Sequence, residues 1–256
     1  MSMIRIGLCV LLLAAGWSAQ ASERQWESLG DTDGVEVSRA DVEGTKLYAF
    51  KGDTVMEAPP GAVLYALLDN QHRIEWVARL VENRVLVQSN EFDYVIYQAF
   101  DLPTPFSDRD YVYRGQATED PETGVVTLAM QSVEHPDAPE TVGVRAELVD
   151  SRYRLTPIDG GERTRVEVEI VTDPRGMMPA WLVNLIQRSW PSDTLNGLRG
   201  ELSKSYAGIH RLPGEEETVA EESGEGPSEA PVEEEQAPVN ESTEEAAPSD
   251  GTEVTK

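Results

Sequence analysis

The sequence predicts an α+β fold in which a curved antiparallel sheet is closed by a long C-terminal helix. Strand-like segments separated by turn signals recur through residues 79–172, and the one long helical span, residues 174–207, comes last. The alternation of strands and helices that a doubly wound sheet requires is missing. A curved sheet with a helix laid across it encloses a hollow, so the function of the chain depends on what that hollow holds.

The first 21 residues have the pattern of a secretory signal peptide. Arg5 supplies a positive charge, residues 8–15 form a short apolar run, and the A-Q-A at residues 19–21 is typical of a cleavage site. A retained membrane anchor is disfavoured because the apolar run is much shorter than the roughly 20 residues of a spanning helix. We therefore expect an exported protein, periplasmic or secreted. Cys9 lies inside this segment, so the mature chain would have no disulfide.

Residues 213–256 have the composition of a disordered acidic tail. They are mostly Glu, Ser, Ala, Pro and Gly, and they hold 15 acidic side chains and one Lys. Residues 22–212 are predicted to be one domain, with 19 basic and 32 acidic side chains. Such a domain is a poor candidate for binding nucleic acid and would not be attracted to an anionic membrane. We expect a monomer that makes at most transient contact with a membrane.

The first elements of the domain are predicted to be a helix, a hairpin and a second helix. Residues 22–29 are predicted as a short opening helix, and residues 35–40 and 46–56 as the strands of the hairpin. The segment 70–78, which contains Trp76, is expected to turn the chain back toward the sheet. Pro59 and Pro60 end the second strand and start a helix with these residues on its buried face: Val63, Leu64, Leu67 and Leu68.

Six more strands are predicted between this helix and the C-terminal span. In the fifth, the apolar residues change parity near Asp150, which predicts a bulge that bends the strand. In the sixth, apolar residues from Val166 to Ile170 alternate with charged ones, so one face would be buried. Pro103 and Pro105 should keep the link between two strands extended and unpaired. The predicted strands are residues 83–88, 92–101, 109–117, 125–133, 142–156 and 163–172.

The C-terminal span carries two apolar stripes that one straight helix could not bury together. Before Pro191 the stripe runs from Met178 to Trp190, and after it from Leu195 to Ile209. At about 100° per residue, the second stripe falls roughly opposite the first. Pro191 is therefore the expected break. We expect the first piece, from Trp181 to Trp190, to face the hollow and the second piece to pack on the sheet or the first helix.

Three segments in order carry a family resemblance. They are APPGAVLYALLDNQHRIEWVARL at residues 58–80, YQAFDLPTPFSDRDYVY at residues 97–113, and MMPAWLVNLIQRSWPSDTLNGLR at residues 177–199. The first contains an R-x-x-W turn, Arg73 to Trp76, and the second a P-x-P-apolar-S-[DN]-R-D pattern. Together they resemble the START (steroidogenic acute regulatory-related lipid transfer) domains, most closely the phosphatidylcholine-transfer-protein-like members. The resemblance covers nearly all of residues 22–212.

The resemblance implies a helix-grip fold, in which a U-shaped antiparallel sheet encloses a tunnel for one lipid or sterol beneath the last helix. It also implies that Arg109 points into the tunnel, where a guanidinium can grip a phosphate or hydroxyl. The alternative is a structural ion pair of Arg109 with Asp108, Asp110 or an acid on a neighbouring strand. The acid found in sterol-binding members is not matched, since Gln98 or Ala99 occupies its place.

Aromatic and methionine side chains are further candidates for contact with a ligand, although core packing is an alternative for all of them. Four tyrosines could surround a quaternary ammonium head group. These are Tyr94, Tyr97, Tyr111 and Tyr113. Unbranched and aromatic side chains adapt to an acyl chain. The candidates for the tunnel lining are Trp76, Met130, Met177, Met178, Trp181 and Leu185.

The sequence indicates no cofactor, no metal site and no catalytic residue. Residues 31–34 begin like a calcium loop, but Val42 stands where a Glu is required, so a turn is predicted. His72, His135 and His210 have no ligand spacing. Nucleophile-elbow and phosphate-loop motifs are missing.

These observations favour an exported protein that binds one phospholipid or other lipid and carries or senses it outside the cytoplasm. One alternative is an enzyme of the aromatase/cyclase type, which would need polar acid–base groups inside the tunnel. The inward-facing strand residues are mostly apolar, which disfavours it. Another alternative is a module that recruits a basic partner through the acidic tail. Deleting residues 213–256 would distinguish lipid binding from recruitment through the tail, because lipid uptake should survive the deletion and capture of a basic partner should not.

Overall fold

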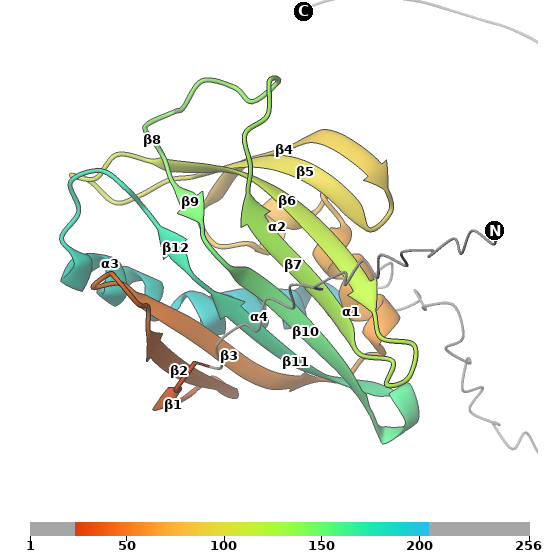
Figure 1. The fold of residues 1–256 in the computed structure, drawn as a ribbon. Coiled ribbons are helices and arrows are strands. Elements are labelled where there is room, and N and C mark those ends of the chain that lie inside the picture. The colour runs from red at the N-terminus through yellow and green to blue at the C-terminus, as the bar shows by residue number, and fades with distance from the viewer. Residues whose placement is uncertain (1–23, 205–256) are drawn as a thin grey trace, which may run out of the picture. The chain divides into compact units, whose positions relative to one another are not determined.

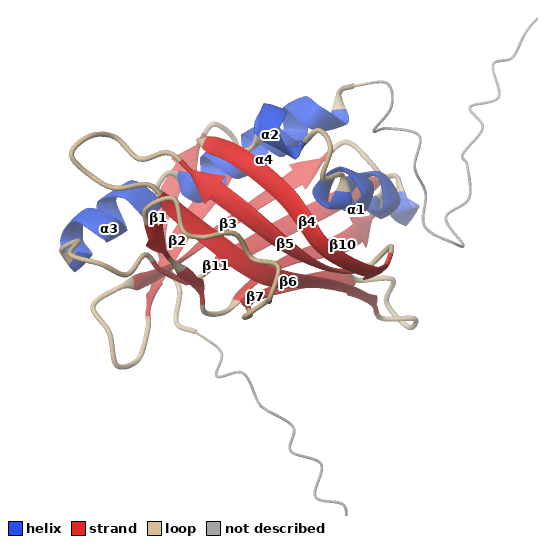
Figure 2. Ribbon diagram, turned by 90° about the horizontal axis from the view of Figure 1, so that it is seen from above, coloured by secondary structure: helices blue, strands red, loops and turns tan. Residues whose placement is uncertain are grey.

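The computed structural model describes residues 24–204, and their fold is a large antiparallel sheet with helices on one side (Figures 1 and 2). The predicted signal peptide, the predicted acidic tail, and Tyr206 and Ile209 lie outside the described residues. The sheet order is β1-β2-β3-β11-β10-β7-β6-β5-β4, and β8 pairs with β6 in parallel. A second, two-stranded sheet consists of β9 and β12. The predicted α+β class and helix-grip arrangement are confirmed.

The strands follow the predicted order closely from β2 onward. The nine strands of the main path pair antiparallel with their neighbours, so the sheet is a meander interrupted where β3 meets β11. The strands are β1 (Glu27–Thr32), β2 (Val35–Asp41), β3 (Tyr48–Met56), β4 (Leu80–Asn90), β5 (Asp93–Phe100), β6 (Arg109–Glu119), β7 (Val126–Ser132), β8 (Val144–Arg145), β9 (Glu147–Leu148), β10 (Ser151–Ile158), β11 (Arg163–Ile170) and β12 (Thr172–Asp173).

Four helices and one 3₁₀ turn accompany the strands within the described range. Pro60 begins α1, and the backbone N–H of Asp69 caps its end by donating to the Tyr65 carbonyl at 2.8 Å. Between residues 24 and 204, no helix is long and apolar enough to cross a membrane. The helices are α1 (Pro60–Leu68), α2 (Arg73–Trp76), α3 (Ala180–Gln187) and α4 (Trp190–Leu202), with η1 (Asp159–Gly161) between β10 and β11.

The predicted opening helix is wrong, because Glu27–Thr32 forms the edge strand β1. Asp33 and Gly34 both have positive φ, at 53° and 78°, which is the backbone of a two-residue hairpin turn. That turn joins β1 to β2, which pair antiparallel. The turn itself was predicted, but its meaning as a hairpin signal was missed, and β1 is too exposed to show a clear alternation of apolar residues.

The predicted fifth strand, residues 142–156, is divided into β8, β9 and β10. The change of side-chain parity near Asp150 therefore marks a break instead of the expected bulge. At this break β9 leaves the main sheet to pair with β12, and β10 resumes in the main sheet at Ser151. The link with Pro103 and Pro105 stays out of the ladder as expected, but it forms a turn in which the Phe106 N–H donates to the Pro103 carbonyl at 3.0 Å.

The C-terminal span is two helices, as its two apolar stripes predicted. The break falls at Arg188 and Ser189, slightly before Pro191, which occupies the first turn of α4. Proline is tolerated there because the first N–H groups of a helix have no partner within the helix. Leu195 and Leu198 on α4 are fully buried against the sheet and α1. The prediction that the second piece packs on the sheet and the first helix is therefore confirmed for the described residues.

Candidate functional site

A cavity of about 220 Å³ lies between the inner face of the sheet, α2 and the two C-terminal helices. Its lining is mostly apolar. Strand residues such as Leu128, Met130 and Tyr153 form the floor, while Val183 and Trp190 close it from the helix side. An apolar space of this kind can hold the hydrocarbon part of a ligand away from water.

Six of the ten predicted site residues line this cavity. They come from α2, from the strands β6 and β7, and from the segment before α3. They are Trp76, Arg109, Tyr111, Tyr113, Met130 and Met178. Their contact with a ligand stays a prediction, since a lining position alone does not establish it.

Tyr94 and Tyr97 do not line the cavity, so the expected cage of four tyrosines is not assembled. The two residues are three apart in β5, and side chains three apart in a strand point to opposite faces. Tyr94 is buried in the main core, whereas Tyr97 packs in a separate small cluster and donates from its hydroxyl to Asp110 Oδ2 at 3.2 Å. Burial, followed by the charge of Asp110, raises the pKa of Tyr97 to about 12.

Trp181 and Leu185 also lie outside the lining, which corrects the expectation that the stripe from Trp181 onward faces the hollow. Their side chains are 68% and 60% exposed, and Met177 just before the helix is fully exposed. The inward face of α3 is formed by Val183, Ile186 and Gln187 instead. The apolar stripe was too broad for the sequence to show which part of it faces the cavity.

Arg109 begins β6 and is 5% exposed. Its Nε donates to the Pro174 carbonyl at 2.8 Å, its Nη2 to the Arg175 carbonyl at 3.3 Å, and its Nη1 to the Ser107 carbonyl. These bonds fix the segment that leads into α3. The considered ion pair of Arg109 with Asp110 is not formed among the described residues.

Two aspartates beside Arg109 have other partners. Asp110 is fully buried and accepts from Arg145 Nε at 2.6 Å, which holds β8 against β6. Asp108 Oδ1 accepts the backbone N–H of Leu102 at 3.0 Å, within the loop between β5 and β6. The guanidinium of Arg109 thus donates to backbone carbonyls, and it forms no ion pair with a carboxylate within residues 24–204.

Arg73 is a further candidate for the site, which the sequence indicated only as the start of the R-x-x-W turn. It is the first residue of α2, it lines the cavity, and it is 6% exposed. Its Nη1 donates to the Tyr113 hydroxyl at 3.2 Å. Burial alone would lower the pKa of Arg73, but the neighbouring Tyr94 and Tyr113 raise it overall, so the guanidinium stays charged. The R-x-x-W turn was noted in the sequence, but nothing in it indicated burial of the arginine.

Two buried N–H donors at the cavity have no hydrogen-bond partner among residues 24–204. They are Nε of Arg73 and the indole Nε1 of Trp76, one turn apart on α2. Buried polar groups are almost always paired, so such donors indicate where a ligand oxygen could accept a hydrogen bond. Gln98 lies nearby, but its amide is engaged, since Oε1 accepts from the Tyr113 hydroxyl at 3.0 Å and Nε2 donates to Asn83 at 2.8 Å.

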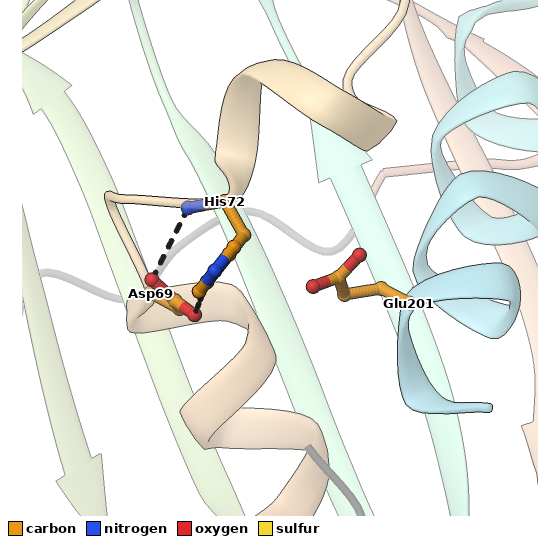
Figure 3. A group of neighbouring side chains, drawn as sticks. All are labelled: Asp69, His72 and Glu201. Carbon is orange, nitrogen blue, oxygen red and sulfur yellow. Dashed lines mark hydrogen bonds and ion pairs between the residues drawn. The ribbon is translucent and has the colours of Figure 1, made fainter. Parts of the chain in front are cut away.

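A charged cluster outside the cavity joins the α1–α2 connection to the end of α4 (Figure 3). His72 Nδ1 lies 2.5 Å from Asp69 Oδ2, and the ligating atoms of Asp69, His72 and Glu201 all lie within 4.8 Å of one another. Lys204 Nζ lies 2.8 Å from both Glu75 and Glu201. The histidine spacing in the sequence indicated no such group, because Glu201 reaches it only through the fold. The ammonium of Lys204 balances part of its negative charge.

Comparison with known proteins places these features in a family. The model of the START domain family matches residues 17–204. An uncharacterized protein of Pseudomonas aeruginosa is 29% identical over 190 residues, which are 74% of this chain and 92% of that protein. The phosphatidylcholine transfer protein of Bos taurus is 32% identical over 163 residues, 62% of this chain and 75% of that protein.

Two solved structures have similar folds. The lipid transfer and protein localization domain of human StarD13 has a TM-score of 0.61 at 26% identity, covering 69% of this chain and 88% of that one. A STAR-related lipid transfer protein from Xanthomonas axonopodis has a TM-score of 0.63 at 24% identity, covering 70% of this chain and 99% of that fragment. The human StAR-related lipid transfer protein 13 is 31% identical over 173 residues. These residues are 66% of this chain but only 15% of that protein.

Proposed function

The chain belongs to the START domain family, and on that premise we propose that it binds one lipid molecule in the cavity and carries or senses it outside the cytoplasm. The observation that carries the proposal is the mostly apolar cavity with two unpartnered N–H donors on one wall. Each methylene group buried there contributes about 0.8 kcal/mol, so several carbons of an acyl chain suffice for binding without any catalytic group.

Exchange of the lipid requires an opening, and α3 is the element best placed to move. One polar anchor joins it to the start of β3, where Asn184 Oδ1 accepts the Tyr48 N–H at 2.9 Å and Nδ2 donates to the Lys46 carbonyl at 3.0 Å. The other joins Gln187 to Thr172 Oγ1 at 3.0 Å. We propose that α3 and the loop of residues 101–108 swing away together from the cavity to admit the lipid and then return.

The exposed residues of this helix fit a transient contact with a membrane. Met177, Trp181 and Leu185, here called the α3 ridge, are the large apolar side chains that α3 and the turn before it leave to solvent. Because the domain is acidic, apolar insertion and not charge would drive the contact. Transfer between neutral vesicles should therefore slow in a Trp181→Ala variant and depend little on salt.

Residues 1–21 support a location outside the cytoplasm, because they have the pattern of a cleaved signal peptide. The mass of the protein recovered from a cell fraction measures this directly. A chain that begins at Ser22 in the periplasm or medium is the expected result. An uncleaved chain that stays in the cytoplasm would contradict this part of the proposal.

Native mass spectrometry after incubation with a lipid extract tests lipid binding itself. The expected result is a single lipid adduct on the protein, and the lack of any adduct would contradict the proposal. A matched pair of variants locates the site. Met130→Trp fills the cavity and should abolish the adduct, whereas Met177→Trp changes an exposed residue and should keep it. Circular dichroism checks that both variants are folded.

A further inference from the structure

The polar cluster outside the cavity has the composition of a metal site (Figure 3). Asp69 follows α1, His72 precedes α2, and Glu201 lies near the end of α4. Each of the three offers one ligand atom, and these atoms lie within 4.8 Å of one another. Two carboxylates and an imidazole form a donor set that divalent transition metals bind. The fold therefore brings together from two distant segments what no spacing in the sequence indicates.

The two carboxylates of this cluster are buried, while the imidazole is partly open to solvent. The side chain of Glu201 is 1% exposed and that of Asp69 8%, whereas that of His72 is 28% exposed. Two carboxylates held this close in a region of low dielectric repel each other unless a positive charge lies nearby. A cation can supply that charge, and the exposed edge of the imidazole gives it a path from solvent.

The positive charges that the cluster already holds can be replaced by a metal ion. His72 Nδ1 lies 2.5 Å from Asp69 Oδ2, a contact bridged by a proton. On the other side, Lys204 Nζ lies 2.8 Å from Glu201 and 2.8 Å from Glu75. If Lys204 leaves Glu201, it keeps Glu75 as a partner at the surface. One divalent cation can therefore take over both contacts without leaving a buried carboxylate uncompensated.

Small movements of the side chains complete the coordination. With metal–ligand bonds of about 2.0–2.2 Å, the ligand atoms of a tetrahedral zinc site lie about 3.4 Å apart, so each ligand atom has to shift by about 1 Å. Asp69 is already oriented, because its Oδ1 accepts the backbone N–H of Gln71 at 3.0 Å and that of His72 at 3.3 Å. Carboxylates that bind metals are typically held by such hydrogen bonds.

We propose that Asp69, His72 and Glu201 bind one Zn²⁺ ion, with water as the fourth ligand, and that the ion clamps α2 onto α4. Zinc is favoured over Ca²⁺ and Mg²⁺, because these ions prefer six or more oxygen ligands and the site includes an imidazole. Helix α2 carries Arg73 and Trp76, which line the cavity, so the ion would hold that wall in place. The site does not depend on what the cavity binds.

Isothermal titration calorimetry on the metal-stripped chain, without its predicted signal peptide, tests the site. Zn²⁺ should bind with a stoichiometry of about one, and Ca²⁺ and Mg²⁺ at least about tenfold more weakly. NMR of the imidazole rings distinguishes the site from binding by the acidic residues 213–256. The signals of His72 should shift on addition of Zn²⁺, and those of His135 should not. Lack of Zn²⁺ binding, equal binding of Ca²⁺ or Mg²⁺, or binding that leaves the His72 signals in place overturns the proposal.

Three variants assign the ligands. His72→Gln should weaken the Kd for Zn²⁺ by at least about tenfold. The matched control His135→Gln changes a ring that lies 3.9 Å from Asp137, outside the cluster, and should leave the Kd unchanged. Lys204→Gln removes the ammonium that competes with the metal for Glu201, so it should tighten binding by about threefold.

The same variants can contradict the proposed ligand set. A Kd for Zn²⁺ that is unchanged in His72→Gln, or that is weaker in Lys204→Gln, would overturn it. Thermal unfolding in the presence of a chelator checks that each variant is folded before metal is added.

Discussion

The helices α3 and α4 are separated by two residues, yet their surroundings differ. On α4, Leu195 and Leu198 are fully buried. Gly197 of α4 lies so close to α2 that a Cβ at this position would come to 2.5 Å from the Trp76 carbonyl oxygen. On α3, the large residues Trp181 and Leu185 are exposed, and Val183 is the one fully buried side chain of that helix.

This difference indicates that the two helices of the C-terminal span have different roles. Helix α4 belongs to the core, and its removal would expose the inner face of the sheet to water. Helix α3 is held by few buried apolar contacts, and elements of this kind open locally at a low free-energy cost. Within the C-terminal span we therefore assign the gating motion to α3 and not to α4, with Arg188 and Ser189 as the hinge.

The largest expected effect separates the two helices by stability. Leu195→Ala should lower the free energy of unfolding by about 2–5 kcal/mol, because it leaves a cavity under α4. Leu185→Ala, the same substitution on α3, should change it by no more than about 0.5 kcal/mol, since the side chain is exposed. Urea denaturation followed by circular dichroism measures both. Similar losses in the two variants would remove the distinction between the helices.

A second comparison tests how tightly α4 packs on α2. Gly197→Ala should destabilise the protein by about 1–3 kcal/mol, because the new methyl group meets the Trp76 carbonyl. Gly200→Ala on the same helix, where a Cβ meets nothing within 4 Å, should stabilise it by about 0.4–1 kcal/mol through helix propensity. Thermal unfolding gives both values. A stabilising Gly197→Ala would mean that α4 is free to move away from α2.

A smaller effect is expected at the polar anchor of α3. Asn184→Ala removes the bonds to Tyr48 and Lys46 and should lower the free energy of unfolding by about 0.5–1.5 kcal/mol. Lipid release should become faster at the same time, because the gate opens more often. Asn184→Asp keeps the acceptor and loses the donor, so its release rate should fall between the two. Stopped-flow release of a fluorescent lipid measures the rates, and unchanged release in Asn184→Ala would argue against α3 as the gate.

The smallest expected effect concerns the cluster of Figure 3. The hydrogen bond with Asp69 raises the pKa of His72, so folding favours the protonated ring. The resulting stability is fully present below the ordinary histidine pKa of about 6.5 and is lost as the pH rises through the raised value. The stability difference between wild type and His72→Gln should therefore be larger at about pH 5.5 than at about pH 8.5. Urea titrations at both values check this, and a difference that grows with pH would have the wrong sign.

Much of the fold could be predicted because its signals are local. Each of three signals reflects the backbone geometry of a single element. They are the alternating residues of β11, the prolines at the start of α1 and the opposed apolar stripes around Pro191. The strand β1 was missed because an exposed edge strand shows no alternation. The separate pairing of β9 with β12 was missed because it depends on where two distant segments meet.

The candidate site was harder to predict, for a physical reason that two residues illustrate. The period of two along a strand could have shown that Tyr94 and Tyr97 cannot share a face. Nothing local could have shown that Arg73 is buried, because its burial is produced by Tyr113 and the sheet beneath α2. Likewise, α3 has one apolar stripe in the sequence, and only its packing decides that Val183 faces inward while Trp181 does not.

Hydrogen exchange of the backbone amides, read out separately for α3 and α4, tests the central claim most directly. In the lipid-free protein, amides of residues 180–187 should exchange at least about tenfold faster than those of residues 194–202, because α3 opens locally while α4 opens only with the whole domain. Addition of the bound lipid should slow α3 and leave α4 nearly unchanged. Equal exchange of the two helices, or slowing confined to α4, would contradict the assignment of the gate to α3.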